Sequence, residues 1–302
     1  SVITSRVHVR KGVWSGTRSI SGQPVPFISA YLSGREEWSP RRLTANEGIQ
    51  FEGSKVNGKG FVLTTEQANR MIGADPMNAD VILPYLNGQD LNSEPQQRPR
   101  RWIINFWDWP EEKACKYVEP WNWLTEHVKP ERQRRDAQGE YVLRKPLPER
   151  WWHHGDKRPK LYHALGRGHS FERHPKAWKA TPPHREVVVS ALVGKYFNPS
   201  VITNTGVFDQ KCIVFTTAWA HAWAALLNSS IVQAWVWHQS SRLGFSLSFS
   251  PSEAIDTLPL IPLESFEAAG VEYLHARSKV MADTIRPLGL TKLYNRFHDS
   301  AD

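Results

Sequence analysis

Short apolar runs along the chain predict strands. Residues 81–86 and 102–106 have strand composition and strand length, and residues 187–193 and 213–215 are further candidates. Residues 245–249 alternate between apolar side chains and serine, which indicates a half-buried strand. Near the N-terminus, residues 7–10 and 25–32 are two extended candidates joined by a connection rich in Gly and Ser.

Helical signals lie between these runs. Thr64 and Gln67 form a capping-box pattern at the start of a short helix, with Gly73 as its expected C-cap. The pattern from Asp108 to Glu111 predicts the start of a helix that reaches Tyr117. Further helices are expected at 121–128, 218–227, 231–237 and 264–285, the last of them long and amphipathic. Mixed strands and helices in this order predict an α+β fold.

The length of 302 residues suits one large or two ordinary domains. A polar segment, residues 33–46, is typical of a linker. No apolar run approaches the roughly 18 residues of a membrane helix, and residues 1–10 lack the apolar region of a secretory signal. Two cysteines, Cys115 and Cys212, provide no disulfide framework. We therefore expect a cytoplasmic protein without a membrane partner.

Positive charge and tryptophan are concentrated in the middle of the chain. Residues 96–185 hold 20 Lys and Arg against 11 Asp and Glu, whereas the remainder holds 18 against 19. The same window contains eight of the 14 tryptophans. Cations mixed with aromatics favour a nucleic-acid partner. The ordinary alternative, tryptophans in the core and cations on the surface, is expected for most of these residues individually.

Two polar segments are candidates for contacts with a partner. Residues 51–61 contain Gly53, Gly58 and Gly60, which permit close approach to a phosphate, although the simpler interpretation is a tight hairpin turn. The connection between the strands at 81–86 and 102–106 is rich in amides and arginines. Its part near 87–92 is expected to set backbone geometry, and its arginine-rich part, 96–101, is the functional candidate.

No catalytic or metal-binding residue is predicted. Six histidines between His153 and His184 lack the spacing of a zinc site, and no serine or cysteine has the context of a nucleophile. Asp209 and Lys211 form a weak nuclease-like fragment. The string at Asn198, Asn-Pro-Ser-Val, lacks the second proline and the aromatic of an adenine amino-methyltransferase. No glycine-rich turn for a nucleotide-like cofactor is present, so no cofactor is expected in this chain.

Several strings occur in order along the chain, including Pro-Tyr-Leu-Asn-Gly-Gln-Asp-Leu-Asn at 84–92 and Arg-Trp-Ile-Ile-Asn-Phe at 101–106. The others lie at 51–54, 58–61, 128–132, 151–152, 226–229, 250–254 and 289–298. Together they resemble the C-terminal half of large adenine-specific DNA methyltransferases of type II restriction–modification systems and their phage-defence relatives. In that family this half is the target-recognition domain, which clamps DNA opposite a Rossmann-like catalytic domain.

The resemblance implies three parts. Residues 1–33 would be the last strands of the catalytic domain, residues 34–262 the DNA target-recognition domain, and residues 263–302 a helical C-terminal segment. The implied partners are double-stranded DNA and the missing catalytic domain, and the full-length parent would use S-adenosylmethionine. Because the catalytic string is missing, methyl transfer by this chain alone is not expected.

Candidate DNA contacts follow from chemical type. Phosphate contacts are expected from six cations: Lys129, Arg132, Arg134, Arg135, Arg158 and Lys160. Phosphate or base contacts are expected from Lys55, Asn57, Lys59, Arg98, Arg100 and Arg101, and base contacts from Gln96 and Gln97. Two other classes remain open: an autonomous metal-dependent nuclease, and a protein-interaction module with a tryptophan docking surface.

Overall fold

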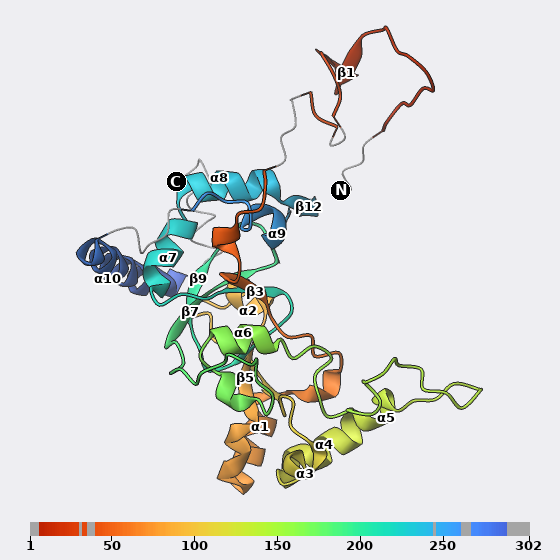
Figure 1. Ribbon diagram of the computed structural model, residues 1–302, viewed down its shortest axis with the longest axis vertical. Coiled ribbons are helices and arrows are strands. Elements are labelled where there is room, and N and C mark those ends of the chain that lie inside the picture. Colours follow the sequence, from red (N-terminus) through yellow and green to blue (C-terminus); the bar gives the residue numbers. More distant parts are fainter. Residues whose placement is uncertain (1–5, 30–31, 35–39, 244–245, 261–266, 289–302) are drawn as a thin grey trace.

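The computed structural model describes residues 6–29, 32–34, 40–243, 246–260 and 267–288. Small sheets and helices are mixed along the chain, which confirms the predicted α+β class (Figure 1). None of the helices in these ranges is both long enough and apolar enough to cross a membrane. The domain boundaries expected near residues 33 and 262 stay predictions, and the string at 289–298 lies outside the described residues.

The first four-stranded sheet contains the two strands predicted most directly. Its order is β10-β5-β6-β4, where β5 (Ile82–Leu86) and β6 (Arg101–Ile104) pair antiparallel. Strand β4 (Val62–Leu63) pairs antiparallel with β6, and β10 (Val207–Phe208) pairs parallel with β5. The parallel pair joins segments more than a hundred residues apart, so residues 207–211 lie beside the end of β5.

The second four-stranded sheet divides two hydrophobic cores. It is antiparallel in the order β3-β11-β7-β9, with bounds Gln50–Glu52, Cys212–Phe215, Glu186–Ala191 and Ser200–Thr203. Successive side chains of a strand point to opposite faces. Val187 and Val189 accordingly pack in one core and Val188 in the other. A sheet buried on both faces favours apolar residues at successive positions, which explains the run of three valines, Val187 to Val189, in β7.

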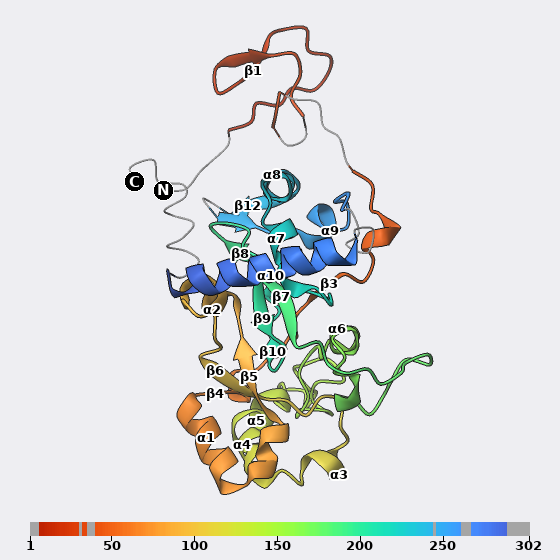
Figure 2. The ribbon, with the colours of Figure 1, turned by 90° about the vertical axis from the view of Figure 1, so that its left-hand side faces the viewer.

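Helices cover the outer faces of both cores. The first core includes residues of α1 (Thr65–Ala74), α2 (Gly88–Ser93), α3 (Glu111–Ala114), α4 (Val118–His127) and α6 (Pro159–Ala164), and α5 (Lys129–Arg132) follows α4 directly. The second core includes residues of α7 (Ala220–Leu227), α8 (Ser230–Gln239), α9 (Pro251–Ala254) and α10 (Ala268–Ile285). Helices α1, α3, α4 and α5 therefore lie at one end of the molecule and α7, α8 and α9 toward the other (Figure 1). The long α10 packs against α7 and lies across the body (Figure 2).

Two smaller sheets complete the fold. One is formed by β12 (Ser241–Leu243), β13 (Ser246–Ser248) and β8 (Val193–Gly194). The other is the hairpin of β1 (Arg18–Ile20) and β2 (Gln23–Val25). Ser21 and Gly22, both with positive φ, turn this hairpin, as a two-residue turn of the type I′ requires. The strand predicted at 7–10 was wrong, and the one predicted at 25–32 is confirmed at Val25 alone among its described residues, because the pairing follows this turn instead. Residues 30 and 31 lie outside the described residues.

Helix ends show where local patterns were decisive. Thr64 accepts a hydrogen bond from the Gln67 backbone, and the Gln67 side chain accepts one from the Thr64 N–H, which confirms the capping box of α1. The predicted C-cap was wrong, because α1 continues through Gly73 to Ala74. Asp108 was also wrongly assigned as a helix cap. Its carboxylate accepts hydrogen bonds from the backbone N–H groups of Glu172 and Arg173, and α3 begins later, at Glu111.

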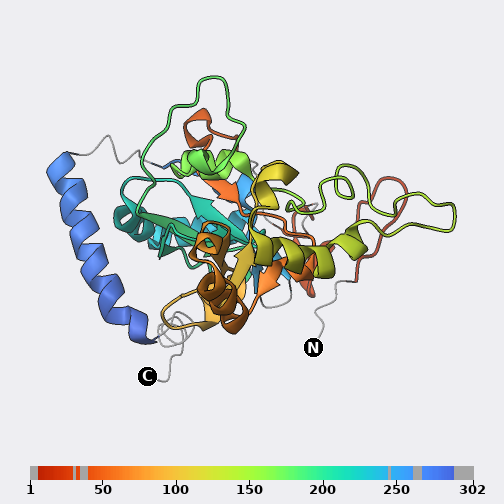
Figure 3. The ribbon, with the colours of Figure 1, turned by 90° about the horizontal axis from the view of Figure 1, so that it is seen from below.

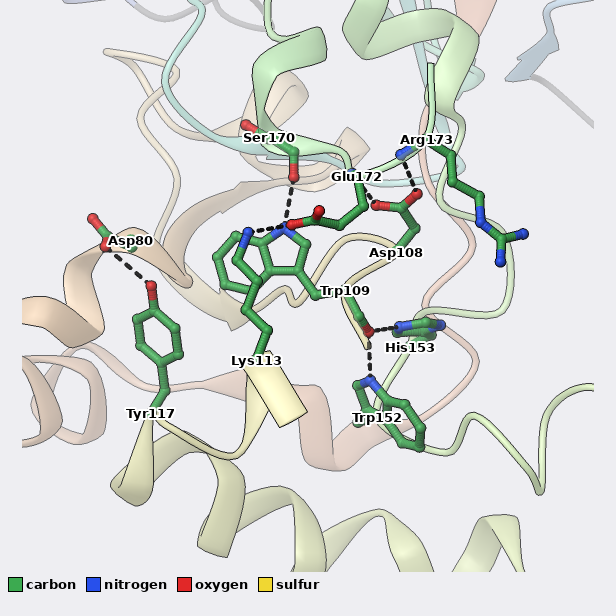
Figure 4. Close-up of polar contacts among 10 residues, drawn as sticks. All are labelled: Asp80, Asp108, Trp109, Lys113, Tyr117, Trp152, His153, Ser170, Glu172 and Arg173. Atoms are coloured by element: carbon green, nitrogen blue, oxygen red, sulfur yellow. Dashed lines mark hydrogen bonds and ion pairs between the residues drawn. The ribbon is translucent and has the colours of Figure 1, made fainter. Parts of the chain in front are cut away.

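Trp109 connects three distant segments (Figure 4). Its carbonyl oxygen accepts hydrogen bonds from Trp152 Nε1 at 3.0 Å and His153 Nε2 at 2.7 Å. Its own indole N–H donates to the Ser170 carbonyl at 2.8 Å. Each bond satisfies a buried polar group that would otherwise be costly. The segment that follows β6 and ends at Trp109 is therefore structural.

Candidate nucleic-acid interface

A polar cleft of about 590 Å³ opens where the two four-stranded sheets meet. Three segments line it. They are residues 56–59 of the glycine loop, which runs from Gly53 to Gly60, the junction of β5 and α2 at 85–93, and the turn between β10 and β11 at 209–211. Val62 of β4, Arg101 at the start of β6, and Val193 complete the lining. The cleft therefore exists only because segments distant in sequence fold together.

The glycine loop joins the two sheets. It follows β3 of the second sheet and leads to β4 of the first, so the tight-hairpin interpretation of this loop was wrong. Ser54 N–H donates to the Phe208 carbonyl at 2.7 Å, which brings the two backbones into contact. A Cβ at Gly53 would lie 2.2 Å from the Asp209 carbonyl oxygen. Glycine is required there because the backbones approach too closely for any side chain.

The opposite wall is held by hydrogen bonds. Asn87 caps α2 by accepting hydrogen bonds from the backbone N–H groups of Gln89 and Asp90. Residues 87–92 were expected to set the backbone geometry, and this capping does so. Tyr85 donates its hydroxyl to the Asp209 carboxylate. Burial, reinforced by this bond and by the charge of Asp209, raises the pKa of Tyr85, so the phenol remains a neutral donor. The turn at 209–211 is thereby fastened to the end of β5.

Six side chains in the cleft make no hydrogen bond or ion pair with any other described residue. They are three amides and three cations: Asn57, Gln89, Gln210, Lys59, Arg101 and Lys211. The Arg101 guanidinium lies 5.8 Å from the centre of the Tyr85 ring, which orients it without neutralising its charge. Asp209, which is bonded to Tyr85, is the acidic residue in the lining. The cleft therefore combines positive charge with amides available to a ligand.

The structure brings three of the predicted residues together in this cleft: Asn57, Lys59 and Arg101. Lys55 lies two residues before Asn57 and is half-buried outside the lining. Gln89, Gln210 and Lys211 were missed as DNA candidates. The sequence carries one signal for Lys211, its position two residues after Asp209, but that fragment is typical of a nuclease rather than of a DNA-binding residue.

Other predicted residues are bonded inside the protein. Gln97 is 6% exposed and donates to the Leu91 carbonyl and the Ser200 hydroxyl. Arg132 is 1% exposed and donates to the Val56 carbonyl at 2.9 Å. Arg158 is paired with Glu52 and Asp156. The DNA contacts expected from these three residues stay predictions, and their side chains have structural partners in this conformation.

The remaining candidates lie outside the cleft. Arg100 pairs with the buried Asp90 at 2.9 Å. Gln96 and Arg98 line a smaller hollow of about 170 Å³ together with Asp283 of α10. Four cations near α5 and α6 are exposed or half-buried: Lys129, Arg134, Arg135 and Lys160. Arg134 and Arg135 begin a loop that extends away from the body after α5 (Figure 1).

Seven of the eight tryptophans of the basic window belong to the core or pack against it, and Trp178 instead stacks on His174. Trp107, Trp109, Trp151 and Trp152 are buried, and Trp102, Trp121 and Trp123 pack against the same cluster. The ordinary interpretation is therefore correct for these seven residues. The four buried rings are not accessible for stacking on a base.

Comparisons with known proteins show which solved structures have a similar fold. No protein-family model matches the sequence, and no curated protein matches it significantly. Among solved structures, the type IIL restriction-modification enzyme MmeI in complex with DNA is similar, with a TM-score of 0.54 and 11% identity. That alignment covers 92% of this chain and 32% of the MmeI chain, so this chain spans about a third of that enzyme.

The type IIG restriction endonuclease BpuSI also aligns, with a TM-score of 0.42 and 10% identity over 76% of this chain and 25% of the other. The likeness to MmeI extends over nearly the whole chain and concerns the fold.

Proposed function

We propose that this chain recognises a double-stranded DNA sequence, as the specificity part of a restriction–modification enzyme. The observation that carries the proposal is the cleft, whose three cations and three amides have no partner among the described residues. Duplex DNA offers a partner for both kinds of group, because phosphates attract cations and adenine edges accept bidentate contacts from amides. Similarity of fold to part of MmeI, solved with DNA, supports the same function.

Within the cleft, the two kinds of side chain have separate tasks. Lys59, Arg101 and Lys211 hold the backbone phosphates and set the position of the duplex. Asn57, Gln89 and Gln210 contact base edges and supply sequence discrimination. Strand pairing and the Tyr85–Asp209 bond hold the walls in place, so the contacts are positioned before DNA arrives.

The salt dependence of DNA binding tests the proposal. Binding of a fluorescent duplex of mixed sequence is measured from low to moderate salt for the chain and for the variant Lys59→Ala/Lys211→Ala. We expect a log–log slope shallower by about 1.8 in this variant, because each lost phosphate contact removes about 0.9. The matched control is Arg70→Ala/Lys116→Ala, two exposed cations at the end of the molecule that carries α1 and α3 (Figure 1).

Each outcome of this measurement has a clear meaning. An unchanged slope in the cleft variant, or an equal change in the control, contradicts the assignment of the cleft. Absence of salt-dependent binding by the unaltered chain contradicts DNA recognition altogether. The duplex is also incubated with the chain in the presence of Mg²⁺ and then recovered. Cleavage of the duplex that depends on the metal would favour the nuclease alternative.

The parent enzyme is proposed to be an adenine-specific amino-methyltransferase that uses S-adenosylmethionine. The support is the series of family-like strings from residue 51 to residue 254. The coding sequence upstream of Ser1 tests this part separately. We expect it to encode an Asn/Asp-Pro-Pro-Tyr/Phe string on a cofactor-binding fold, and a complete upstream region without one would refute the methyltransferase parent while leaving DNA recognition intact.

A further inference from the structure

Three side chains with metal-binding chemistry converge far from the cleft. Glu186 is the first residue of β7, His221 lies in the first turn of α7, and His275 lies in the middle of α10. One potential ligand atom from each lies within 4.8 Å of the other two. The closest recorded pair, His221 Nε2 and Glu186 Oε2, is 3.3 Å apart.

His221 lacks the hydrogen bonds that a buried histidine normally makes. It is 2% exposed, and neither ring nitrogen has a hydrogen-bond partner in the described part of the chain. The Nε2 atom is close to the Glu186 carboxylate without the geometry of a hydrogen bond. His153 and His154, by contrast, each bond a backbone carbonyl through Nε2. Since buried polar groups are rarely left unsatisfied, His221 is oriented for another partner.

His275 faces the same point from α10. Its Nδ1 atom is buried and has no hydrogen-bond partner among the described residues. Its ring meets the His221 ring edge to face, with centroids 5.0 Å apart, and lies 5.7 Å from the Trp219 ring. Two imidazoles and one carboxylate thus surround a common position.

Lys279 and Asp283 of α10 are charged neighbours of His221. Lys279 is paired with Asp283 at 3.3 Å on the exposed side of α10, so this lysine is directed to its own acidic partner.

Helix α10 contacts the body along α7. Its less exposed residues are Val271, His275, Ser278 and Ala282, at the spacing of one helical face. Of these, Val271 is the one that belongs to the second core. Large apolar residues of the same helix, including Tyr273 and Met281, are more than half exposed. Figure 3 shows α10 (blue) lying along the edge of the molecule, where a bond through His275 would fasten it.

We propose that Glu186, His221 and His275 bind a divalent transition-metal ion of the zinc class, which fastens α10 to α7 and β7. Two imidazoles and a carboxylate are ligands that Zn²⁺ favours and that Mg²⁺ and Ca²⁺ do not. Tetrahedral bonds of about 2.0–2.1 Å place ligand atoms about 3.3 Å apart, which matches the His221–Glu186 distance. Glu186 and His275 are half-exposed, so water has access to the fourth position. This site is independent of the proposed DNA function.

Metal titration of the full chain tests the site. Zn²⁺ binding is measured by calorimetry and Co²⁺ binding by its visible absorption bands, with one ion per chain and a tetrahedral spectrum expected. His275→Ala and Glu186→Gln each remove one ligand from an accessible position, and we expect zinc affinity to fall at least about 100-fold in both. Circular dichroism confirms that both variants remain folded.

The matched control is the histidine pair outside the cluster. His163 Nε2 and His174 Nδ1 lie 3.1 Å apart, and His174→Ala removes an exposed histidine of this pair and should leave zinc affinity unchanged. Equal affinity in the unaltered chain and in His275→Ala overturns the proposal, as does loss of binding in His174→Ala alone. Absence of stoichiometric zinc or cobalt binding to the unaltered chain overturns it as well.

A second readout concerns the helix itself. At zinc concentrations about 100 times the dissociation constant, the melting temperature should rise by about 5 °C, because the ion binds the folded chain preferentially. Hydrogen exchange should slow in α10, and both effects should vanish in His275→Ala. Zinc that binds without protecting α10 would contradict the fastening role.

Discussion

Two groups of polar side chains in this molecule differ in what they bind. The interior group, Arg132, His153, His154 and Arg167, donates to backbone carbonyls in the first core, those of Val56, Trp109, Ile104 and Gly206. The cleft group, Asn57, Lys59, Gln89, Arg101, Gln210 and Lys211, has no such partners among the described residues. Arginine occurs in both groups. Their difference shows that function follows from which polar groups remain available, and that composition alone does not report it.

The largest expected effect is the loss of stability of the interior group in acid. Burial lowers the pKa of His153 to about 4 and that of His154 to about 3, and a bond to a carbonyl opposes each shift. Unfolded histidine titrates near pH 6.5, so below this pH the unfolded chain binds more protons than the folded chain. The free energy of unfolding should therefore fall from pH 6.5 toward pH 4, by about 1.4 kcal/mol per pH unit for each histidine.

Urea unfolding at a series of pH values measures this slope. His153→Gln keeps a donor for the Trp109 carbonyl but cannot titrate. In this variant the unfolding free energy should therefore change less steeply with pH, by the contribution of one histidine. His169→Asn, at an exposed position, is the control and should retain the full slope. A slope unaffected by His153→Gln would show that this residue does not couple folding to protons.

Substitution of Arg132 tests whether the interior group, unlike the cleft group, stabilises the fold. Arg132→Ala removes a buried side chain, leaves the Val56 carbonyl with the Gly155 N–H as its remaining described donor and opens space beside Phe61. Relief of the buried charge offsets part of the loss, and we expect the free energy of unfolding to fall by about 3 kcal/mol. Denaturant unfolding measures this loss. The salt slope of DNA binding should not change, and a shallower slope would instead place Arg132 on the DNA.

The same substitution at Arg101 should give the opposite result. Arg101 is exposed at the cleft, so Arg101→Ala should change stability by less than about 0.5 kcal/mol. The salt slope of DNA binding should become shallower by about 0.9, because one phosphate contact is lost. Arg101→Lys should restore most of the slope, since it restores the charge. If Arg101→Ala lowered the free energy of unfolding as much as Arg132→Ala, the proposed difference between the interior and cleft groups would be contradicted.

Gln89 gives the smallest expected effect and the most specific one. Gln89→Ala removes an amide from the cleft without removing charge. We expect discrimination between the preferred duplex and one altered at a single adenine to fall by about 1 kcal/mol, with an unchanged salt slope. Competition binding with a duplex library identifies the preferred site and measures the change. Uniform weakening across all sequences would assign Gln89 to the backbone instead.

Local sequence was sufficient where short-range physics decides the structure. The capping box of Thr64 and Gln67, the apolar runs that became β5 and β6, and the break between α7 and α8 at Ser229 all depend on neighbours within a few residues. The long helix was also correct where it is described, from Ala268 to Ile285. The α+β class followed from the same signals.

Only the tertiary structure decided which groups are available. Arg101 and Arg132 look alike in the sequence, and burial separates them because one lies at a cleft edge and the other beneath the glycine loop. The cleft needs the parallel pairing of β5 with β10, and the histidine cluster needs α10 to lie on α7. Residues so far apart in sequence carry no local signal of their contact, because burial and pairing are properties of the whole fold.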